Sequence, residues 1–195
     1  MKSAVQLALI AVLFTFIVAC SSGNNAPYVP SVSAGDGGKE AHAMAFTLAS
    51  SSFQNGENIP RVSTCDSDDR SPGLVWHGAP AGTQSFALIV DDPDAPSGTF
   101  VHWVLFDIPA SLSSIPESGL AEATVLGGTL GRNDFGKLGY NGPCPPPGKP
   151  HRYFFKLYAL DAPLKQSRGA TKAAVEAAMK GHILGQATLM GKYGR

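Results

Sequence analysis

Residues 86–108 read FALIVDDPDAPSGTFVHWVLFDI, and their pattern predicts a pair of strands. The first five residues form a continuous apolar run, which is typical of a strand buried on both faces. The segment from Asp91 to Pro96 ends this strand, because proline fixes φ and lacks a backbone donor. In residues 101–108 both faces of an alternating strand are apolar, one with His102, Val104 and Phe106 and the other with Val101, Trp103 and Leu105.

The rest of the domain has a sequence pattern typical of a β-rich fold, in which short apolar runs are separated by Gly, Pro, Ser and Asp. In residues 151–160, alternation places one row on a core-facing side: His151, Tyr153, Phe155, Leu157 and Ala159. Thr171 is a suitable N-cap for a helix that Gly181 ends, and residues 183–190 are predicted to form a second short helix. We therefore predict a mainly β domain over residues 44–195 with a few peripheral helices.

The charge balance argues against a nucleic-acid partner. The chain has 195 residues, with 15 Lys and Arg against 15 Asp and Glu and a formal net charge of zero. Nucleic-acid-binding domains carry a basic patch or stripe, and no basic run occurs in this sequence. The length suits one domain with a single core.

The first 19 residues have the features of an export signal peptide. Lys2 supplies a positive start, and the apolar run over residues 5–18 is shorter than the roughly 20 residues of a spanning helix. Ile17-Val18-Ala19-Cys20 resembles the lipobox of bacterial lipoproteins, in which cleavage before the cysteine is accompanied by acylation of its thiol. We expect an exported bacterial lipoprotein, anchored to a membrane through lipidated Cys20. The alternatives are an ordinary cleaved signal and an uncleaved anchor helix.

Residues 20–43 have the composition of a disordered linker, rich in Ser, Gly, Asn, Ala and Pro and without apolar periodicity. A flexible tether of this length spans on the order of 25 Å. Ser21 and Ser22 lack the aspartate associated with inner-membrane retention, so the periplasmic side of the outer membrane is expected if the organism is Gram-negative.

Three cysteines occur in the sequence, and lipidation of Cys20 would leave Cys65 and Cys144 as a pair. Disulfides persist in the compartments that exported proteins reach. We therefore predict a Cys65–Cys144 bridge that clamps the wall of the candidate site. The alternative is two buried free thiols, since unpaired cysteine often behaves as a small hydrophobe.

Two segments concentrate the residues that carry chemistry, DPDAP at residues 92–96 and GYNGP at residues 139–143. Asp92 and Asp94 would face the same way in an extended segment, and a carboxylate that accepts from one histidine nitrogen leaves the other as a donor. His102, His151, the Tyr153 hydroxyl and the free amide near Gly142 would then form a receptor for a small anion. The alternative is that the histidines are satisfied core residues.

These segments, together with Asp134-Phe135-Gly136-Lys137, Cys144-Pro145-Pro146 and His151-Arg152-Tyr153, resemble the phosphatidylethanolamine-binding protein family, in particular its bacterial Raf-kinase-inhibitor-like branch. The resemblance implies a β-sandwich of two sheets and a small anion pocket at one end. It places the pocket on Asp92, Asp94, Pro96, His102, Gly142, Pro143, His151 and Tyr153. Eukaryotic members have two adjacent histidines where this chain has Val101-His102, so kinase inhibition is not carried over.

The resulting hypothesis is an envelope-anchored binding and regulatory module with no cofactor, not an enzyme. Its expected partners are a small anionic ligand or phospholipid head group, the membrane through its lipid anchor, and a regulated protein. The alternatives are a metal-dependent enzyme that uses His102, His151 and Asp92, and a protein-interaction lipoprotein with a vestigial pocket. No Gly-x-Ser-x-Gly motif marks a hydrolase nucleophile.

Overall fold

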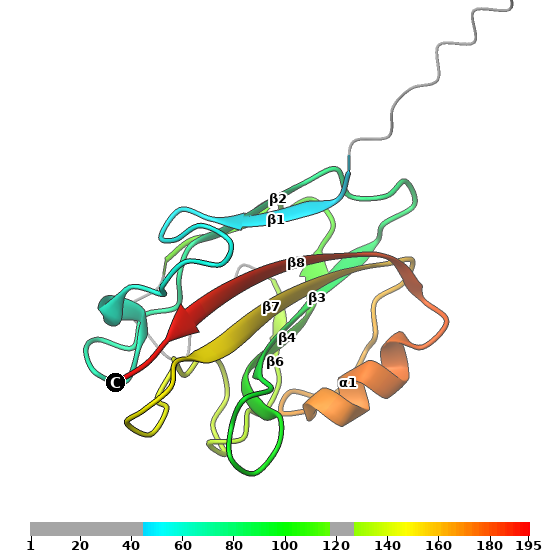
Figure 1. Cartoon of the computed structure of the whole chain (residues 1–195). Helices are drawn as coiled ribbons and strands as arrows, with labels where there is room; N and C mark the ends of the chain where they lie inside the picture. Colours follow the sequence, from blue (N-terminus) through cyan, green and yellow to red (C-terminus); the bar gives the residue numbers. More distant parts are fainter. Residues whose placement is uncertain (1–44, 118–126) are drawn as a thin grey trace, which may run out of the picture. The chain divides into compact units, whose positions relative to one another are not determined.

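Strands dominate the domain, as expected, and form two antiparallel sheets (Figure 1). The computed structural model describes residues 45–117 and 127–195. The three-stranded sheet has the order β1-β2-β5 and the five-stranded sheet the order β6-β4-β3-β7-β8. The elements are β1 (Thr47–Ser50), η1 (Arg61–Ser63), β2 (Leu74–His77), β3 (Ser85–Asp92), β4 (Phe100–Pro109), β5 (Ser114–Ile115), β6 (Thr129–Leu130), β7 (His151–Leu160), α1 (Lys172–Met179) and β8 (Ile183–Tyr193).

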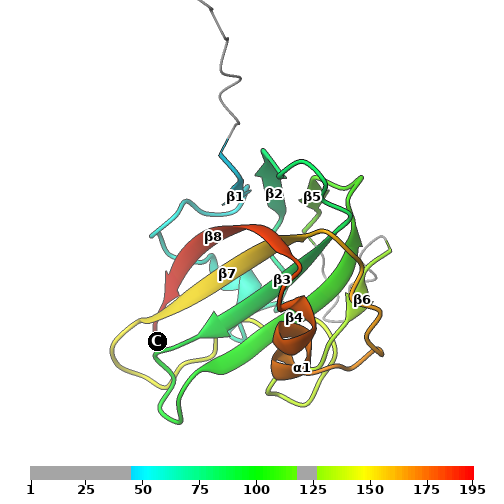
Figure 2. The same ribbon diagram turned by 90° about the vertical axis from the view of Figure 1, so that its right-hand side faces the viewer.

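The five-stranded sheet is covered on both faces, which explains why β3 is buried along its whole length. One face packs against the three-stranded sheet through a core that includes Trp76, Trp103 and Phe155. The other face packs against α1, where Val175 and Met179 contact a second apolar cluster (Figure 2). The predicted two-sheet, mainly β fold is therefore confirmed, with a single α-helix in the described part of the chain.

The end of β3 also anchors α1 electrostatically. Asp91 is 1% exposed, and its carboxylate forms ion pairs with Lys156 of β7 at 2.9 Å and with Lys172 of α1 at 2.6 Å. Asp91 and Asp92 are consecutive in a strand and point to opposite faces. One carboxylate therefore holds the helix, and its neighbour is available to the other face.

The predicted second helix over residues 183–190 is wrong, because this segment is the first part of β8. It pairs along β7, from Ile183 opposite Leu160 to Tyr193 opposite His151. Burial alternates in its second half, where Ala187 and Leu189 are buried. Pairing with β7 satisfies the backbone groups that an isolated short helix would leave to water, and this tertiary gain outweighs local propensity.

Strict alternation in β4 is also wrong, because its pairing with β3 shifts register twice, once at Phe106–Asp107 and once at a β-bulge at His102. The bulge at His102 is the one that shapes the site. Val90 pairs with Trp103 and Asp91 with Val101, so His102 is an extra residue with no partner on β3. Alternation would place His102 beside Val104, on the face toward α1. The bulge turns it to the other face, where its ring lies 5.2 Å from that of Tyr153.

The segment that carries Cys144 is fastened to the loop after η1. A disulfide joins Cys65 to Cys144, as predicted, across a sequence separation of 79 residues. Beside it, the Cys65 amide donates to the Pro143 carbonyl at 3.1 Å, and the buried Tyr140 hydroxyl donates to the Ser63 carbonyl at 2.6 Å. These contacts fix the course of a segment that has no regular secondary structure.

The predicted signal peptide, Cys20 and the linker lie outside the described residues. Within residues 45–117 and 127–195, no helix combines the length and apolar character that a membrane crossing requires.

Replacing both bridge cysteines, Cys65→Ser with Cys144→Ser, is expected to lower the free energy of unfolding by roughly 2–5 kcal/mol, because the unfolded chain regains the entropy of a long open loop. Both cysteines are exposed, so the substitution itself leaves no buried cavity. Urea unfolding without reductant measures the difference. As a control, reductant should destabilise the natural sequence and leave the double variant unchanged; equal stability of the two oxidised proteins would contradict the prediction.

Candidate functional site

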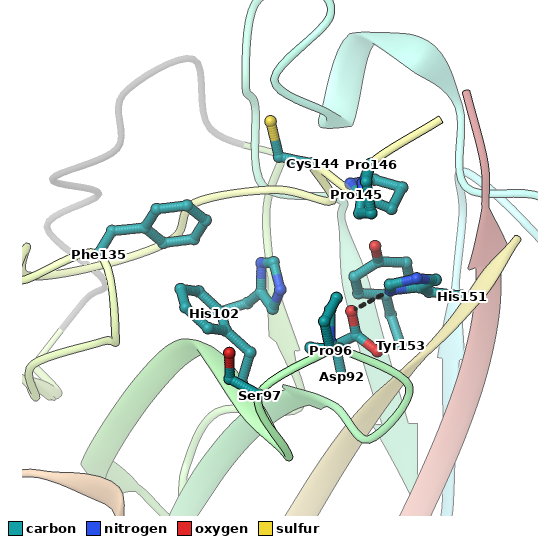
Figure 3. A pocket seen from close by; sticks show the side chains of 12 residues that line it. Asp92, Pro96, Ser97, His102, Phe135, Cys144, Pro145, Pro146, His151 and Tyr153 are labelled. Carbon is teal, nitrogen blue, oxygen red and sulfur yellow. Dashed lines mark hydrogen bonds and ion pairs between the residues drawn. The ribbon is translucent and has the colours of Figure 1, made fainter. Parts of the chain in front are cut away.

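A cavity of about 250 Å³ opens at the end of the five-stranded sheet where β3 ends and β4 and β7 begin (Figure 3). Its lining combines a small group of polar side chains with a mostly apolar wall. The lining residues are Asp92, Ala95, Pro96, Ser97, Phe100, His102, Phe135, Cys144, Pro145, Pro146, His151 and Tyr153. The structure thus brings together five of the eight predicted pocket residues, namely Asp92, Pro96, His102, His151 and Tyr153.

Asp92 holds His151 in a fixed orientation. The Asp92 side chain is buried, and its Oδ2 lies 2.8 Å from Nδ1 of His151, while its Oδ1 accepts from the Asp94 amide at 2.8 Å. An ionised carboxylate can only accept, so the proton of this contact lies on Nδ1 of His151. Nε2 is then the ring nitrogen that His151 can offer to a ligand.

His102 is held in the same manner by a backbone carbonyl. Its Nδ1 lies 2.8 Å from the carbonyl oxygen of Asn141, to which it donates. The ring is only 3% exposed, and this burial lowers the pKa of His102 below that of a free imidazole. His102 is therefore a neutral ring near pH 7 whose Nε2 remains available in the pocket.

The Tyr153 hydroxyl is buried in the cavity without a well-formed hydrogen bond. Tyr153 is 1% exposed, and its hydroxyl makes no well-formed hydrogen bond to a described residue, although the Asp92 carboxylate lies close enough to act as a weak acceptor. In Figure 3 this hydroxyl and the His102 ring point into the cavity, toward the wall of Pro145 and Pro146. Burial, reinforced by the nearby Asp92 charge, raises the pKa of Tyr153, so the hydroxyl stays protonated and can donate.

An aromatic wall closes one side of the pocket, and the sequence patterns did not predict it. Phe100, His102 and Phe135 pack edge to face, with ring centroids 4.8–5.4 Å apart. Phe100 begins β4, whereas Phe135 lies in the Asp134-Phe135-Gly136-Lys137 motif, which identified the family but carried no predicted site role. The two residues are 35 positions apart, so no local periodicity could have paired them.

A hydrogen-bond network behind the pocket positions His102, and its members were also missed. The Asn133 side chain donates to Asn141 Oδ1 at 2.8 Å and to the Gly139 carbonyl at 3.1 Å. Asp69 accepts from the Asn141 side chain at 3.1 Å. The Asn141 side chain is thus held from two sides, which fixes the residue whose backbone carbonyl orients His102. The only available signal was the presence of Asn141 in a recognised motif.

The predicted role of Gly142 as a free donor is wrong. Its amide donates to Asp69 Oδ1 at 2.6 Å and is unavailable to a ligand. A glycine is required for a different reason: a Cβ at this position would overlap the Ser63 carbonyl oxygen and lie 2.9 Å from the Thr64 Cα. Pro143, whose carbonyl accepts from Cys65, also lies outside the lining, and Pro145 and Pro146 form the wall instead.

Asp94 does not join Asp92 in the cavity either. Its carboxylate makes a bidentate pair with Arg152, at 2.7 and 2.8 Å, and accepts from the Arg152 amide at 2.9 Å. Hydrogen bonding from Arg152 lowers the pKa of Asp94 to about 2. Asp94 therefore ties the rigid turn to the start of β7 and acts as a support for the pocket.

The polar groups of the pocket are unusual for an anion site, because none of the lining residues is a lysine or arginine. The polar lining consists of one carboxylate, two imidazoles and two hydroxyls. The alternative metal site fits less well, since no group of three or more His, Cys, Asp or Glu side chains in residues 45–117 and 127–195 is arranged to hold an ion. With Nδ1 protonated, Nε2 of a neutral imidazole is an acceptor, so the Tyr153 and Ser97 hydroxyls are the donors of the lining, and an imidazole donates to a ligand only when both of its nitrogens are protonated. A small polar ligand could be held by these groups and pack against the apolar wall.

Comparison with known proteins gives the same family by sequence and by structure. The family model described as phosphatidylethanolamine-binding protein matches residues 49–194. A UPF0098 protein of Aquifex aeolicus is 51% identical over 157 residues, which cover 80% of this chain and 92% of that protein.

Two crystal structures are similar to this chain over about three quarters of its length. A putative phosphatidylethanolamine-binding protein homologue from Chlamydia trachomatis has a TM-score of 0.72 and 37% identity, over 77% of this chain and 98% of that one. YbcL of Escherichia coli has the same TM-score and coverage with 34% identity. Fold, motif order and sequence identity therefore agree: the chain belongs to the phosphatidylethanolamine-binding protein family.

Proposed function

We propose that this protein is an envelope-anchored binding and regulatory module whose pocket holds a small anion such as a phosphate monoester. Family membership supports a binding role in general. The observation that carries the anion assignment is the buried Tyr153 hydroxyl, which lacks a well-formed hydrogen bond, beside two histidines whose Nδ1 atoms are already fixed. A buried donor without a partner is costly, and a ligand oxygen at this point would remove the cost.

The size of the cavity limits the part of a ligand that can enter. About 250 Å³ is below the 300–1,000 Å³ of ordinary drug-sized pockets, and the cavity suits a head group rather than a whole lipid. The aromatic wall of Phe100 and Phe135 would contact whatever carbon skeleton the anionic group carries. Phosphate and phosphoethanolamine are therefore suitable first probes.

The charge of the pocket decides how an anion could be held. Asp92 is the one acidic side chain in the lining, and the only groups there that can become positive are His102 and His151. An anion next to an imidazole stabilises the protonated ring, so binding is accompanied by proton uptake. The apolar wall strengthens such a contact by excluding water.

The proposal that the domain is anchored rests on the sequence before it. Ile17-Val18-Ala19-Cys20 has the pattern of a lipobox, and 24 residues separate Cys20 from the first described residue, Ala45. The disulfide in the structure is consistent with an oxidising compartment. Together these features favour a lipoprotein of the periplasmic side of the outer membrane if the organism is Gram-negative.

Titration with phosphate or phosphoethanolamine is expected to shift the imidazole NMR signals of His102 and His151, and Tyr153→Phe should weaken binding about fivefold to tenfold through loss of one donor. The same substitution should leave the free energy of unfolding unchanged or raise it, since a buried hydroxyl without a well-formed hydrogen bond is removed. Histidine signals that stay unchanged at high ligand concentration would overturn the anion assignment.

Tyr140→Phe is the matched control, because Tyr140 is equally buried but its hydroxyl already donates to the Ser63 carbonyl. This variant should lose roughly 1–2 kcal/mol of stability, as the buried carbonyl is left without its donor. Urea unfolding of both variants distinguishes a hydroxyl that binds the ligand from one that stabilises the fold. A destabilised Tyr153→Phe would show that its hydroxyl serves the fold.

Anion affinity is expected to rise as the pH falls from about 8 to about 5, by up to about tenfold per pH unit for one proton taken up. The sign follows from His102: burial lowers its pKa in the free protein, and a bound anion raises it again, so lower pH favours the complex. Calorimetry in two buffers of different ionisation enthalpy measures the proton uptake. A flat pH profile would indicate neutral hydrogen bonding instead.

Cys20→Ser is expected to release the protein from membranes, because one thioether-linked diacylglycerol provides most of the anchoring free energy. Fractionation of cells and the mass of the purified chain measure the anchor directly. A variant that remains in the membrane fraction would contradict the lipoprotein assignment, and Ser21→Ala serves as the control that should remain attached.

A further inference from the structure

We propose that the end of the domain opposite the pocket is a lipid-facing surface, which rests on the proposed Cys20 anchor. The surface, here called the tether end, consists of the loops at residues 78–84 and 109–113 and the Ile183-Leu184 pair. It would lie against the membrane that carries the anchor and direct the pocket toward the aqueous compartment.

The first observation is an exposed apolar pair. Among the described residues, three large hydrophobic side chains are classed as exposed: Phe135 (40%), Ile183 (47%) and Leu184 (40%). Phe135 belongs to the pocket. Ile183 and Leu184 are consecutive at the start of β8, where ordinary alternation would send one of them into the core.

A β-bulge in β8 accounts for this double exposure. Ala159 pairs with Gly185 and Leu160 with Ile183, so Leu184 is an extra residue without a partner on β7. Bulges at the ends of strands redirect side chains. Because of this bulge, Ile183 and Leu184 can both be exposed although they are consecutive in the strand. The Leu184 side chain extends beside the loop at 78–84, where its Cδ1 lies 3.9 Å from the position that a Cβ of Gly82 would occupy.

The second observation is the lack of ionisable side chains in the two loops beside the pair. The loops at residues 78–84 (GAPAGTQ) and 109–113 (PASLS) contain no ionisable side chain. They lie at the same end of the sheet as Ile183, since Ser85 pairs with both Pro109 and Leu160, and Leu160 pairs with Ile183. Lys180 and the exposed His182–Asp161 ion pair, at 2.7 Å, border the apolar pair, and basic side chains are common where a surface meets lipid head groups.

The third observation is the position at which the chain enters the domain. Phe46 lies at the tether end, because a Cβ on Gly185 would meet its ring at 3.5 Å and Pro80 at 2.9 Å. The described domain therefore begins at this end, and Cys20 precedes Ala45 by 25 positions in the sequence. The length and attachment of the tether favour the anchoring bilayer as the occupant of the surface.

The pocket lies at the other end of the same strands. β7 runs from His151 in the pocket lining to Leu160 at the tether end, a distance of about 30 Å for ten residues in a strand (Figure 1). With the tether end on the bilayer, the pocket cannot reach head groups of that leaflet. The inference therefore selects ligands dissolved in the aqueous compartment.

The test attaches the chain from Cys20 onward to vesicles through its one free thiol, since the other two cysteines form the bridge. Coupling to a maleimide phospholipid in phosphatidylcholine vesicles makes the result independent of whether cells acylate Cys20. Amide hydrogen exchange, compared with the uncoupled protein, is expected to slow several-fold at residues 78–84 and 181–185 and to stay unchanged at residues 93–99.

The variant Ile183→Ser with Leu184→Ser should abolish the slowing, and Phe135→Ser, which removes an exposed hydrophobic at the pocket end, should leave it intact. Unchanged melting of the double variant in solution would show that the fold is retained. The inference would be overturned if exchange at the tether end were unaffected. It would also be overturned if exchange slowed at residues 93–99 on vesicles with or without phosphatidylethanolamine. The mass of the cellular protein tests acylation separately.

Discussion

The pocket depends on one extra residue in β4. The bulge at His102 places two consecutive side chains, His102 and Trp103, on the face toward the three-stranded sheet. Trp103 fills the core, and His102 is displaced into the cavity beside Tyr153. Without the bulge, alternation would bury the imidazole under α1 among Val104 and Phe106, where the described apolar cluster offers it no partner.

Hydrogen bonds, an ion pair and the disulfide surround this bulge and restrict the conformational freedom of the site. Asp94 fastens the turn after β3 to Arg152, and the network of Asp69, Asn133 and Asn141 holds the carbonyl that orients His102. The Cys65–Cys144 disulfide fixes the wall formed by Pro145 and Pro146. Preorganisation of this kind lowers the ordering cost of binding, so a cavity with few donors can still discriminate among ligands.

Much of the fold could be predicted because its patterns are local. The buried run before Asp92 and the row from His151 to Ala159 follow from periodicity, and the Cys65–Cys144 pairing follows from counting cysteines. The bulges could not be predicted, since their register is set by the partner strand. In β8, glycines at 185 and 191 interrupt the apolar alternation, so a strand was mistaken for a helix.

The candidate site shows the same division between local and long-range information. Asp92, His102, His151 and Tyr153 were found because their residue types carry chemistry, and the structure gathers them in one cavity. Phe100 and Phe135 of the lining, and Asp69 in the network behind it, were missed because only the folded chain brings them to the site. Gly142 was identified correctly as special, but the close neighbour is the Ser63 backbone and not a ligand.

The disulfide also has a consequence for how the pocket wall responds to redox conditions. Cys144 lines the cavity and Cys65 does not, so the bond joins the wall to the loop after η1. The hydrogen bonds from the Cys65 amide to Pro143 and from the Tyr140 hydroxyl to Ser63 connect the same two segments without the bond. Reduction therefore removes the covalent restraint on the wall and leaves these two contacts to hold it.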